Sequence, residues 1–193
     1  MGSFTSMPKI NPTADADDDD VDYPRERIAL APFLEKCAQN LNQGPPIPRQ
    51  WRHKADGYGR LTSFPFQESE SIRVFQWNAL SQALGTGNDN FVKCPPKALD
   101  WRTRRFRMLE EIARHSADVI CLQEVDHFGF FRKSLASLGY VGHFTPKPDS
   151  PCLYLAENAG PDGCAIFFKK DKFELVKLDS RVLEVWQVQS NQV

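Results

Sequence analysis

An apolar run in the middle of the chain, Val119–Leu122, narrows the possible folds more than any other segment. It follows Ala117 and Asp118, and two residues later the chain reaches a carboxylate, Glu124. Short, nearly continuous apolar runs are typical of strands that are buried on both faces, as in parallel sheets. The sequence therefore predicts a strand over residues 117–124 within an α/β domain.

An earlier strand and a helix complete a strand–helix–strand unit. Residues 72–78 are β-rich and partly alternate between apolar and polar, which predicts the first strand. Asp100 can cap the following helix. The predicted apolar face of this helix consists of Phe106, Leu109, Ile112 and Ala113. Arg102, Arg105 and Arg107 lie mostly on its other faces and are expected to be solvated, with a phosphate-binding role as the alternative. A helix between two strands is the crossover that parallel neighbours require.

The second half of the chain predicts another helix and further strands. A helix over residues 127–138 should end at Gly139 and be followed by a strand, Tyr140–Phe144. The apolar face of that helix would consist of Phe131, Leu135 and Leu138. A Pro-rich loop occupies residues 146–161. Two strands, Cys164–Phe168 and Phe173–Leu178, are then expected to form a hairpin.

The first 70 residues predict little regular structure. We interpret residues 1–48 as an acidic disordered tail followed by a short helix and a Pro-rich linker, and residues 49–70 as an irregular lead-in. Pro32 could begin the helix, which would pack either on the main domain or on nothing. Its apolar face would consist of Leu34, Cys37, Ala38 and Leu41. Residues 71–193 form the predicted main domain.

Bulk composition argues against several classes of protein. The five cysteines form no C-x-x-C pair, which makes a disulfide framework or zinc site unexpected. No apolar run is long enough to span a bilayer, and no secretory signal is evident, so we expect a cytoplasmic protein, with mitochondrial or nuclear pools left open. The net charge of −1 gives no bulk argument for nucleic-acid binding. The sequence leaves the oligomeric state open.

Asn78 and Glu124 are the candidate site residues, because each ends one of the two predicted parallel strands. The carboxyl ends of parallel strands lie at one edge of a sheet, where α/β proteins bind ligands. A carboxylate after an apolar strand needs compensation, and Mg²⁺ prefers such oxygen ligands. From spacing alone, both residues could also simply lead from strands into loops.

Several segments, in order and with close spacing, resemble the endonuclease/exonuclease/phosphatase superfamily, and most closely one group within its deadenylase-like branch. The principal segments are Gln76–Asn78, Cys121–His127 and Pro161–Phe168. Additional matches are Gln82–Gly85, Asp89–Val92, Pro146–Pro148, Ser150–Cys152 and Asn191–Val193. The resemblance covers about residues 72–193 and implies the front half of a four-layer α-β-β-α sandwich.

The resemblance also implies specific roles. Glu124 would be a Mg²⁺ ligand, Asn78 would help bind the scissile phosphate, and Lys147 would contact a substrate phosphate. Lys147 could otherwise be a solvated loop lysine. Asp126 and His127 could support Glu124, although a role in starting a helix is the stronger expectation. Asp162 is expected to serve the turn before Gly163 rather than the chemistry.

The implied reaction is Mg²⁺-dependent phosphoester hydrolysis, with removal of the 2′-phosphate of NADP(H) as the first reading. The alternative is 3′-end shortening of poly(A) RNA by a deadenylase. The family's later motifs, an Asp-x-Asn pair, a strand His and a closing Asp-His pair, are missing, so the chain reads as C-terminally truncated. We therefore expect the isolated chain to be weakly active or inactive. A non-catalytic binding or regulatory role remains a further alternative.

Overall fold

The computed structural model describes residues 26–41, 71–86, 91, 93–155 and 158–181. The expectations for residues 1–23, the linker after Gly44 and the lead-in at 49–70 lie outside these residues. The described part is a mixed α/β structure with a four-stranded sheet, which confirms the predicted class. No helix within it has the length and apolar character needed to cross a membrane.

The sheet has the strand order β1-β2-β4-β3. Its strands are β1 (Val74–Asn78), β2 (Val119–Val125), β3 (Tyr140–Pro146) and β4 (Gly163–Lys169). β1 and β2 are parallel, which confirms the predicted crossover, whereas β4 pairs antiparallel with both β2 and β3. The β1–β2 register pairs Asn78 with Gln123, so both strands end at the same edge.

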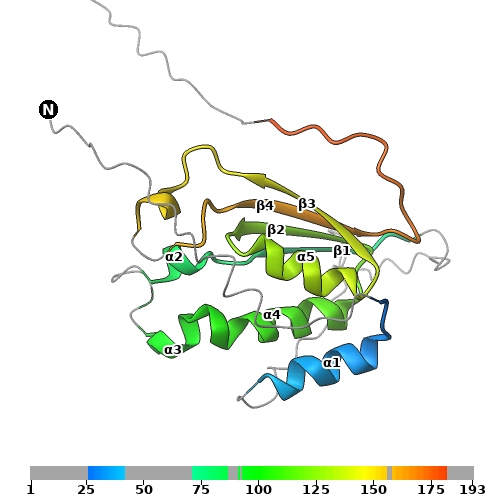
Figure 1. The fold of residues 1–193 in the computed structure, drawn as a ribbon, viewed down its shortest axis with the longest axis horizontal. Coiled ribbons are helices and arrows are strands. Elements are labelled where there is room, and N and C mark those ends of the chain that lie inside the picture. The colour runs from blue at the N-terminus through cyan, green and yellow to red at the C-terminus, as the bar shows by residue number, and fades with distance from the viewer. Residues whose placement is uncertain (1–25, 42–70, 87–90, 92, 156–157, 182–193) are drawn as a thin grey trace, which may run out of the picture.

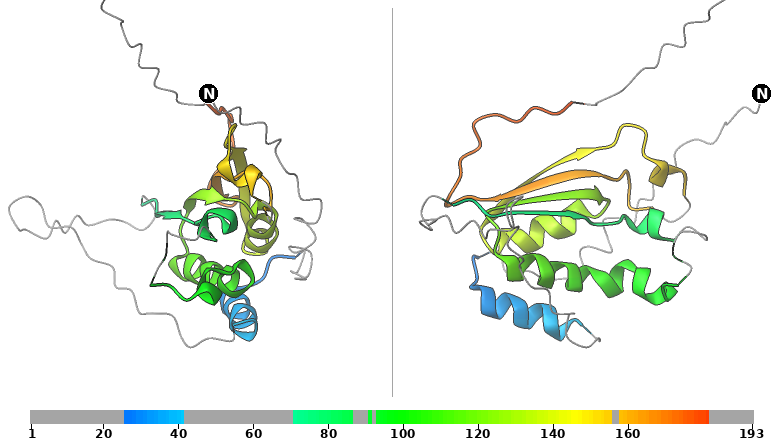
Figure 2. Two further views of the ribbon diagram at one scale, coloured as in Figure 1. Left: turned by 90° about the vertical axis from the view of Figure 1, so that its left-hand side faces the viewer. Right: turned by 180° about the vertical axis from the view of Figure 1, so that it is seen from behind.

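Helices cover one face of this sheet (Figure 1). They are α1 (Leu30–Gln39), α4 (Trp101–His115) and α5 (Phe128–Ala136). The short helix α3 (Pro96–Leu99) leads into α4, while α2 (Gln82–Gly85) and a 3₁₀ helix, η3 (Pro151–Tyr154), pack together at the end of the sheet (Figure 1). α5 packs on β3, α4 shares the core with β2 on the same side of the sheet, and α1 packs on α4 (Figure 2). The core is the apolar layer between the sheet and these helices.

The predicted features of α4 are confirmed with one exception. The Asp100 carboxylate accepts a hydrogen bond from the Thr103 N–H at 2.9 Å, as expected of a cap, and the predicted apolar face is buried. The prediction of a solvated Arg105 was wrong, because this side chain is buried. Its guanidinium lies over the rings of Phe106 and Phe130, and such cation–π contacts offset the cost of burial.

The expectation that β2 is buried on both faces was also wrong. Ile120, Leu122 and Val125 are buried against the helices, whereas Cys121 and Gln123 are only half-buried. The reason is that the described residues place helices on one face only. The opposite face of the sheet, which bears the exposed side chains of Val74 and Ile166, has the character of a surface that needs a second layer.

The predicted hairpin between Cys164–Phe168 and Phe173–Leu178 does not form. β4 lies between β2 and β3, so both of its edges are already hydrogen-bonded. Residues 173–181 instead run as an extended segment on the side of the sheet away from the helices (Figure 1). Their alternation resembled a strand, but Val176, in the middle of the segment, is 94% exposed.

Helix α1 is an integral part of the domain. It begins at Leu30, before Pro32, and its buried residues are Phe33 and Cys37, whereas the predicted face included Ala38, which is exposed. Phe33 has 0% exposure in the core shared with α4. Of the two alternatives for this helix, packing on the main domain is therefore confirmed.

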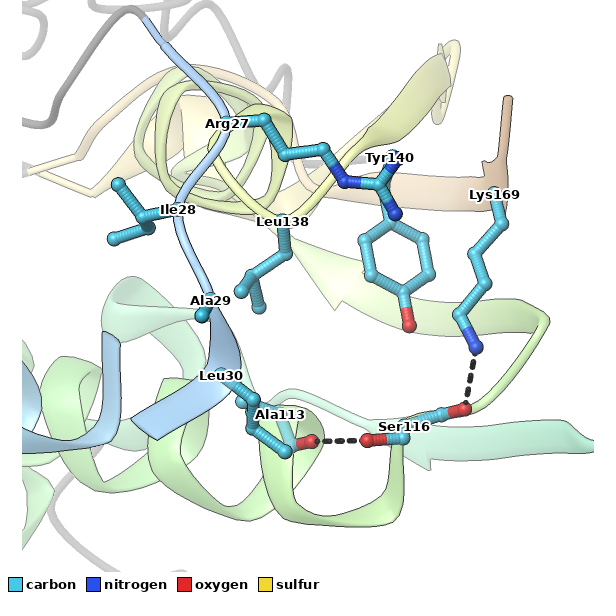
Figure 3. A pocket seen from close by; sticks show the side chains of 9 residues that line it. All are labelled: Arg27, Ile28, Ala29, Leu30, Ala113, Ser116, Leu138, Tyr140 and Lys169. Atoms are coloured by element: carbon cyan, nitrogen blue, oxygen red, sulfur yellow. Dashed lines mark hydrogen bonds between the residues drawn. The ribbon is translucent and has the colours of Figure 1, made fainter. Parts of the chain in front are cut away.

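The residues just before α1 lie at the end of the sheet opposite Asn78 and Glu124. The Ile28 N–H donates to the Ser137 carbonyl at 2.8 Å, just after α5. Residues 27–30 border a cavity of about 220 Å³ together with side chains of α4, β3 and β4 (Figure 3). The Lys169 ammonium at its rim donates to the Ser116 carbonyl at 2.9 Å. We interpret this cavity as a packing gap, since both of its cations are engaged within the protein: Lys169 as described, and Arg27 with Asp171 at 2.8 Å.

Asp118 is a buried carboxylate at the start of β2. Burial alone would raise its pKa, but hydrogen bonds from the Arg73 N–H, Lys172 and Lys169 outweigh burial and hold the pKa below its usual value. A depressed pKa in the folded state stabilises the protein above the pKa of the unfolded state, about 3.9. This stability is therefore lost as the pH falls below about 5.

We expect Asp118→Asn to lower the free energy of unfolding by about 2 kcal/mol at pH 7 and to flatten its dependence on pH between 6 and 3. Urea unfolding at several pH values measures both effects. Asp171→Asn is the control, because Asp171 is also ion-paired but is exposed, and its change should be much smaller. A variant of Asp118 with the wild-type pH profile would contradict this account.

Candidate active site

The structure brings Asn78 and Glu124 into direct contact at the carboxyl edge of β1 and β2. The Asn78 Nδ2 donates to Glu124 Oε1 at 2.7 Å. The parallel register places Asn78 beside Gln123, so Glu124 emerges one residue beyond the paired strands. The predicted proximity of the two side chains is therefore confirmed, whereas their chemical roles stay predictions.

Glu124 has an unusual backbone conformation. Its φ is +53°, in the left-handed region that costs a non-glycine residue about 1–2 kcal/mol. The pairing of β2 with β4 shifts register between Leu122 and Val125, so Glu124 lies within an irregularity of the ladder. Strained backbone of this kind concentrates at functional sites, where the surrounding structure enforces it. The observation favours a functional role for Glu124 independently of its charge.

The orientation of the Asn78 carboxamide is fixed from both ends. Its Oδ1 accepts the Leu80 N–H at 2.8 Å, and its Nδ2 is committed to Glu124. Leu80 also has a left-handed backbone, with φ of +56°. The pair thus has one strained member, Glu124, and a strained neighbour, Leu80, so it is held in one geometry.

The donor set of this edge fits a Mg²⁺ ion that is bound mainly by water and substrate. Among the described residues, Glu124 Oε2 accepts no hydrogen bond, and it remains available as a ligand. Mg²⁺ commonly uses one or two carboxylates and keeps several waters. No group of three or more His, Cys, Asp or Glu side chains gathers anywhere in the part of the chain that the structure describes.

Lys147 and Glu124 line the same hollow. This hollow has a volume of about 440 Å³ and lies between the ends of β2, β3 and β4 and the extended segment at 179–181. Lys147 is exposed, and its backbone N–H donates to the Asp162 carbonyl at 2.8 Å. The placement is compatible with contact between the Lys147 ammonium and a substrate phosphate, and it does not distinguish that role from a solvated lysine.

Asp126 and His127 occupy a neighbouring buried site rather than the first turn of α5. Asp126 Oδ2 accepts the Gln82 N–H at 2.6 Å, at the start of α2, and its Oδ1 accepts from His127 Nδ1 at 2.7 Å. The His127 ring stacks on Trp101 with centroids 4.1 Å apart. His127 occupies the N-cap position of α5, as a role in starting the helix predicts, but neither side chain makes a capping hydrogen bond to α5. Their contacts tie α2 to the strand that carries Glu124.

Asp162 has a structural environment. It is buried, and its Oδ1 accepts hydrogen bonds from the Ser150 hydroxyl and from the Cys152 thiol. The next residue, Gly163, has no room for a side chain, because a Cβ there would lie 2.3 Å from the Thr145 carbonyl oxygen. These contacts anchor the loop that follows β3, which agrees with the expectation that Asp162 serves the turn before Gly163.

Sequence reasoning missed Arg104. This side chain donates to the carbonyls of Ala79 and Leu80, directly after Asn78. Arg104 lies in a helix that contains several arginines, and its position in the helical repeat does not distinguish it from a solvent-exposed arginine. The left-handed conformations of Leu80 and Glu124 were missed as well, since neither residue type signals a positive φ.

Comparisons with known proteins agree with the geometry. A model of the endonuclease/exonuclease/phosphatase family matches residues 75–184. The chain is 47% identical to nocturnin of Drosophila melanogaster over 213 residues, covering 100% of this chain and 33% of that protein. It is 47% identical to human nocturnin over 169 residues, covering 87% of this chain and 38% of that protein.

A more distant relative comes from the deadenylase side of the superfamily. The chain is 35% identical to the CCR4-Not complex 3′-5′-exoribonuclease subunit Ccr4 of Aspergillus oryzae, over 80% of this chain and 20% of that protein. The nocturnins are the group that the motifs resembled, so the predicted resemblance is confirmed. The chain spans about a third of the length of the nocturnins it matches.

Proposed function

The chain belongs to the endonuclease/exonuclease/phosphatase family, and we propose that its site serves Mg²⁺-dependent hydrolysis of a phosphoester in a nucleotide. The contact between Asn78 and Glu124, at the edge where the two parallel strands end, carries this proposal. Glu124 would hold the ion through the oxygen that Asn78 leaves available. The bound ion would supply charge neutralisation for the phosphate that is cleaved.

The residues of the chain itself would bind and orient the phosphate. The Asn78 amide is fixed by Leu80 and Glu124, so it would meet the phosphate without rotating. Lys147, at the same hollow, would add a compact positive charge. Positioning and charge stabilisation supply most of the catalysis in phosphoryl transfer, which is why a fixed pair and a nearby cation suit this reaction.

We propose the 2′-phosphate of NADP(H) as the substrate group. The support is similarity: nocturnins match at up to 47% identity, and the motifs of that group imply this substrate. The second candidate is 3′-end shortening of poly(A) RNA. It is supported by the match to a 3′-5′-exoribonuclease subunit at 35% identity. Both candidates place a nucleotide phosphate in the hollow between Glu124 and Lys147.

The two substrates can be separated directly. On the longest natural form that carries these residues, we expect Mg²⁺-dependent phosphate release from NADPH and much slower shortening of poly(A). Glu124→Gln should abolish whichever activity is observed. Poly(A) shortening that exceeds phosphate release, and is lost in Glu124→Gln, would favour the exoribonuclease. Activity of equal size in the variant would contradict the proposed site.

Residues 1–193 alone are expected to show little or no hydrolysis. Among the described residues that line the hollow there is no histidine, and Asp162 is buried and accepts from Ser150. The remaining carboxylate, Asp179, is exposed beside Arg181 on the extended segment, so the described part of the hollow offers no positioned general base for water. Robust phosphate release by the purified 193-residue chain, lost in Glu124→Ala, would refute this expectation.

A further inference from the structure

The turn that follows β1 holds Asn78 in place through its backbone. Ala79 is 5% exposed, and Leu80 has a left-handed φ of +56°. A carbonyl in such a turn has no partner in a regular ladder, so buried carbonyls there need another donor. The donor in this structure is a single side chain of α4, Arg104.

Arg104 spans both carbonyls of the turn with its two terminal nitrogens. Nη1 donates to the Ala79 carbonyl at 2.7 Å, and Nη2 donates to the Leu80 carbonyl. Its Nε donates to the Leu99 carbonyl at 3.1 Å, so the third N–H group of the planar head also has a partner. The guanidinium thereby links helix α4 to the turn at fixed angles, because its donors lie in one rigid plane.

The turn passes this constraint to the candidate active site. The Leu80 N–H donates to Asn78 Oδ1, and Asn78 Nδ2 donates to Glu124 Oε1. The peptide whose carbonyl Arg104 holds at Ala79 is the one that contains the Leu80 N–H. A shift of this peptide plane would therefore rotate the Asn78 amide away from Glu124.

We propose that Arg104 is a positioning residue of the active site, which holds the turn at Ala79 and Leu80 so that the Asn78 amide is aligned on Glu124. This inference rests on the proposed function for its catalytic consequence and on the contacts alone for its structural one. Arg104 does not line the hollow, and its hydrogen bonds nearest the site go to the carbonyls of the turn, so we expect it to act on the site through the turn.

The surroundings of Arg104 keep its side chain in this position. Its guanidinium lies 5.6 Å from the centroid of the Trp101 ring. Burial lowers its pKa from the usual value, while the nearby carboxylates of Asp126 and Asp100 act in the opposite direction. Asp126 is also the residue that binds the start of α2, so the cation is electrostatically coupled to both segments that follow the parallel strands.

The test compares Arg104→Gln and Arg104→Lys with Arg102→Gln, which changes an exposed arginine of the same helix. One readout is the side-chain NH₂ signal of Asn78 in a ¹H–¹⁵N spectrum of the 193-residue chain, identified by its loss in Asn78→Asp. The other is kcat and KM for NADPH in the longest natural form. We expect Arg104→Gln to shift the Asn78 signal and to lower kcat by about 10–100-fold with little change in KM.

Arg104→Lys should recover only part of kcat, because one ammonium cannot match a planar fork on two carbonyls. Arg102→Gln should leave the signal and kcat unchanged. An unshifted Asn78 signal with normal kcat in both Arg104 variants, or full recovery with lysine, would overturn the inference. If Arg104→Gln fails to fold, Arg104→Lys decides by the same two readouts.

The two proposals fail in different ways. If the wild-type protein releases no phosphate from NADPH and does not shorten poly(A), the proposed function fails, while the Asn78 signal still decides whether Arg104 sets the amide. If the wild type is active and the Arg104 variants match it in both readouts, the proposed function stands and the positioning role is rejected.

Discussion

In the longest natural form that carries these residues, replacing Glu124 with alanine is expected to lower kcat/KM for the phosphoester substrate by a factor of about 10³ or more, because a lost metal ligand removes several kcal/mol of transition-state stabilisation. The same change should abolish the increase in Tm that Mg²⁺ gives the wild-type 193-residue chain, since a ligand stabilises only the state that binds it. Phosphate release and thermal unfolding with and without Mg²⁺ measure the two effects.

A second variant at the same position distinguishes the effect of losing the carboxylate from the effect of the backbone conformation. Glu124→Gly removes the same carboxylate and should be as inactive as Glu124→Ala. However, Glu124 has φ of +53°, a conformation that glycine adopts without strain and alanine does not. We therefore expect the glycine variant to be the more stable of the two, with a free energy of unfolding about 1 kcal/mol higher than that of the alanine variant. Equal stability of the two would show that the left-handed conformation is absent in solution.

Phe33→Ala is expected to lower the free energy of unfolding by about 3–5 kcal/mol. Phe33 has 0% exposure, and its removal would leave a cavity between α1 and α4 that rigid neighbours fill only in part. A loss of this size is a large fraction of the stability of a typical domain. Urea unfolding at neutral pH measures it.

The control for Phe33 lies in the same helix. Leu30 is 37% exposed, so Leu30→Ala should cost much less than the change at Phe33. If Phe33→Ala unfolds with the wild-type midpoint, α1 does not contribute to the core in solution. The measurement therefore tests directly whether α1 belongs to the domain, because residues 26–41 are separated from β1 by a stretch of chain outside the described residues.

Local patterns predicted most of the elements. The apolar period of α4 and the cap at Asp100 placed that helix correctly, and the parallel pair β1–β2 followed from the helix between them. Gly139, with φ of +87°, follows the end of α5 as expected. These features depend on neighbours in the sequence, so the sequence itself contains the information.

Features that depend on distant contacts could not be predicted. β4 inserts between β2 and β3, and its partners are chosen across many residues rather than by a turn. The Arg105 guanidinium is buried because it lies over the rings of Phe106 in α4 and Phe130 in α5. The same distinction holds for the site. The order of the strands predicted that Asn78 and Glu124 lie at one edge of the sheet, whereas the contacts of Arg104 with the turn depend on how α4 packs and have no signal in the local sequence.

The central position of β4 has a consequence for synthesis of the protein on the ribosome. β2 is complete at Val125, but its second partner arrives only with Gly163–Lys169. Until then, one edge of β2 presents unpaired N–H and C=O groups, and β3 has no neighbour in the sheet. A nascent chain that pauses in this interval exposes a strand edge to other chains, so we expect this interval to be the stage of synthesis at which the domain is most prone to aggregate.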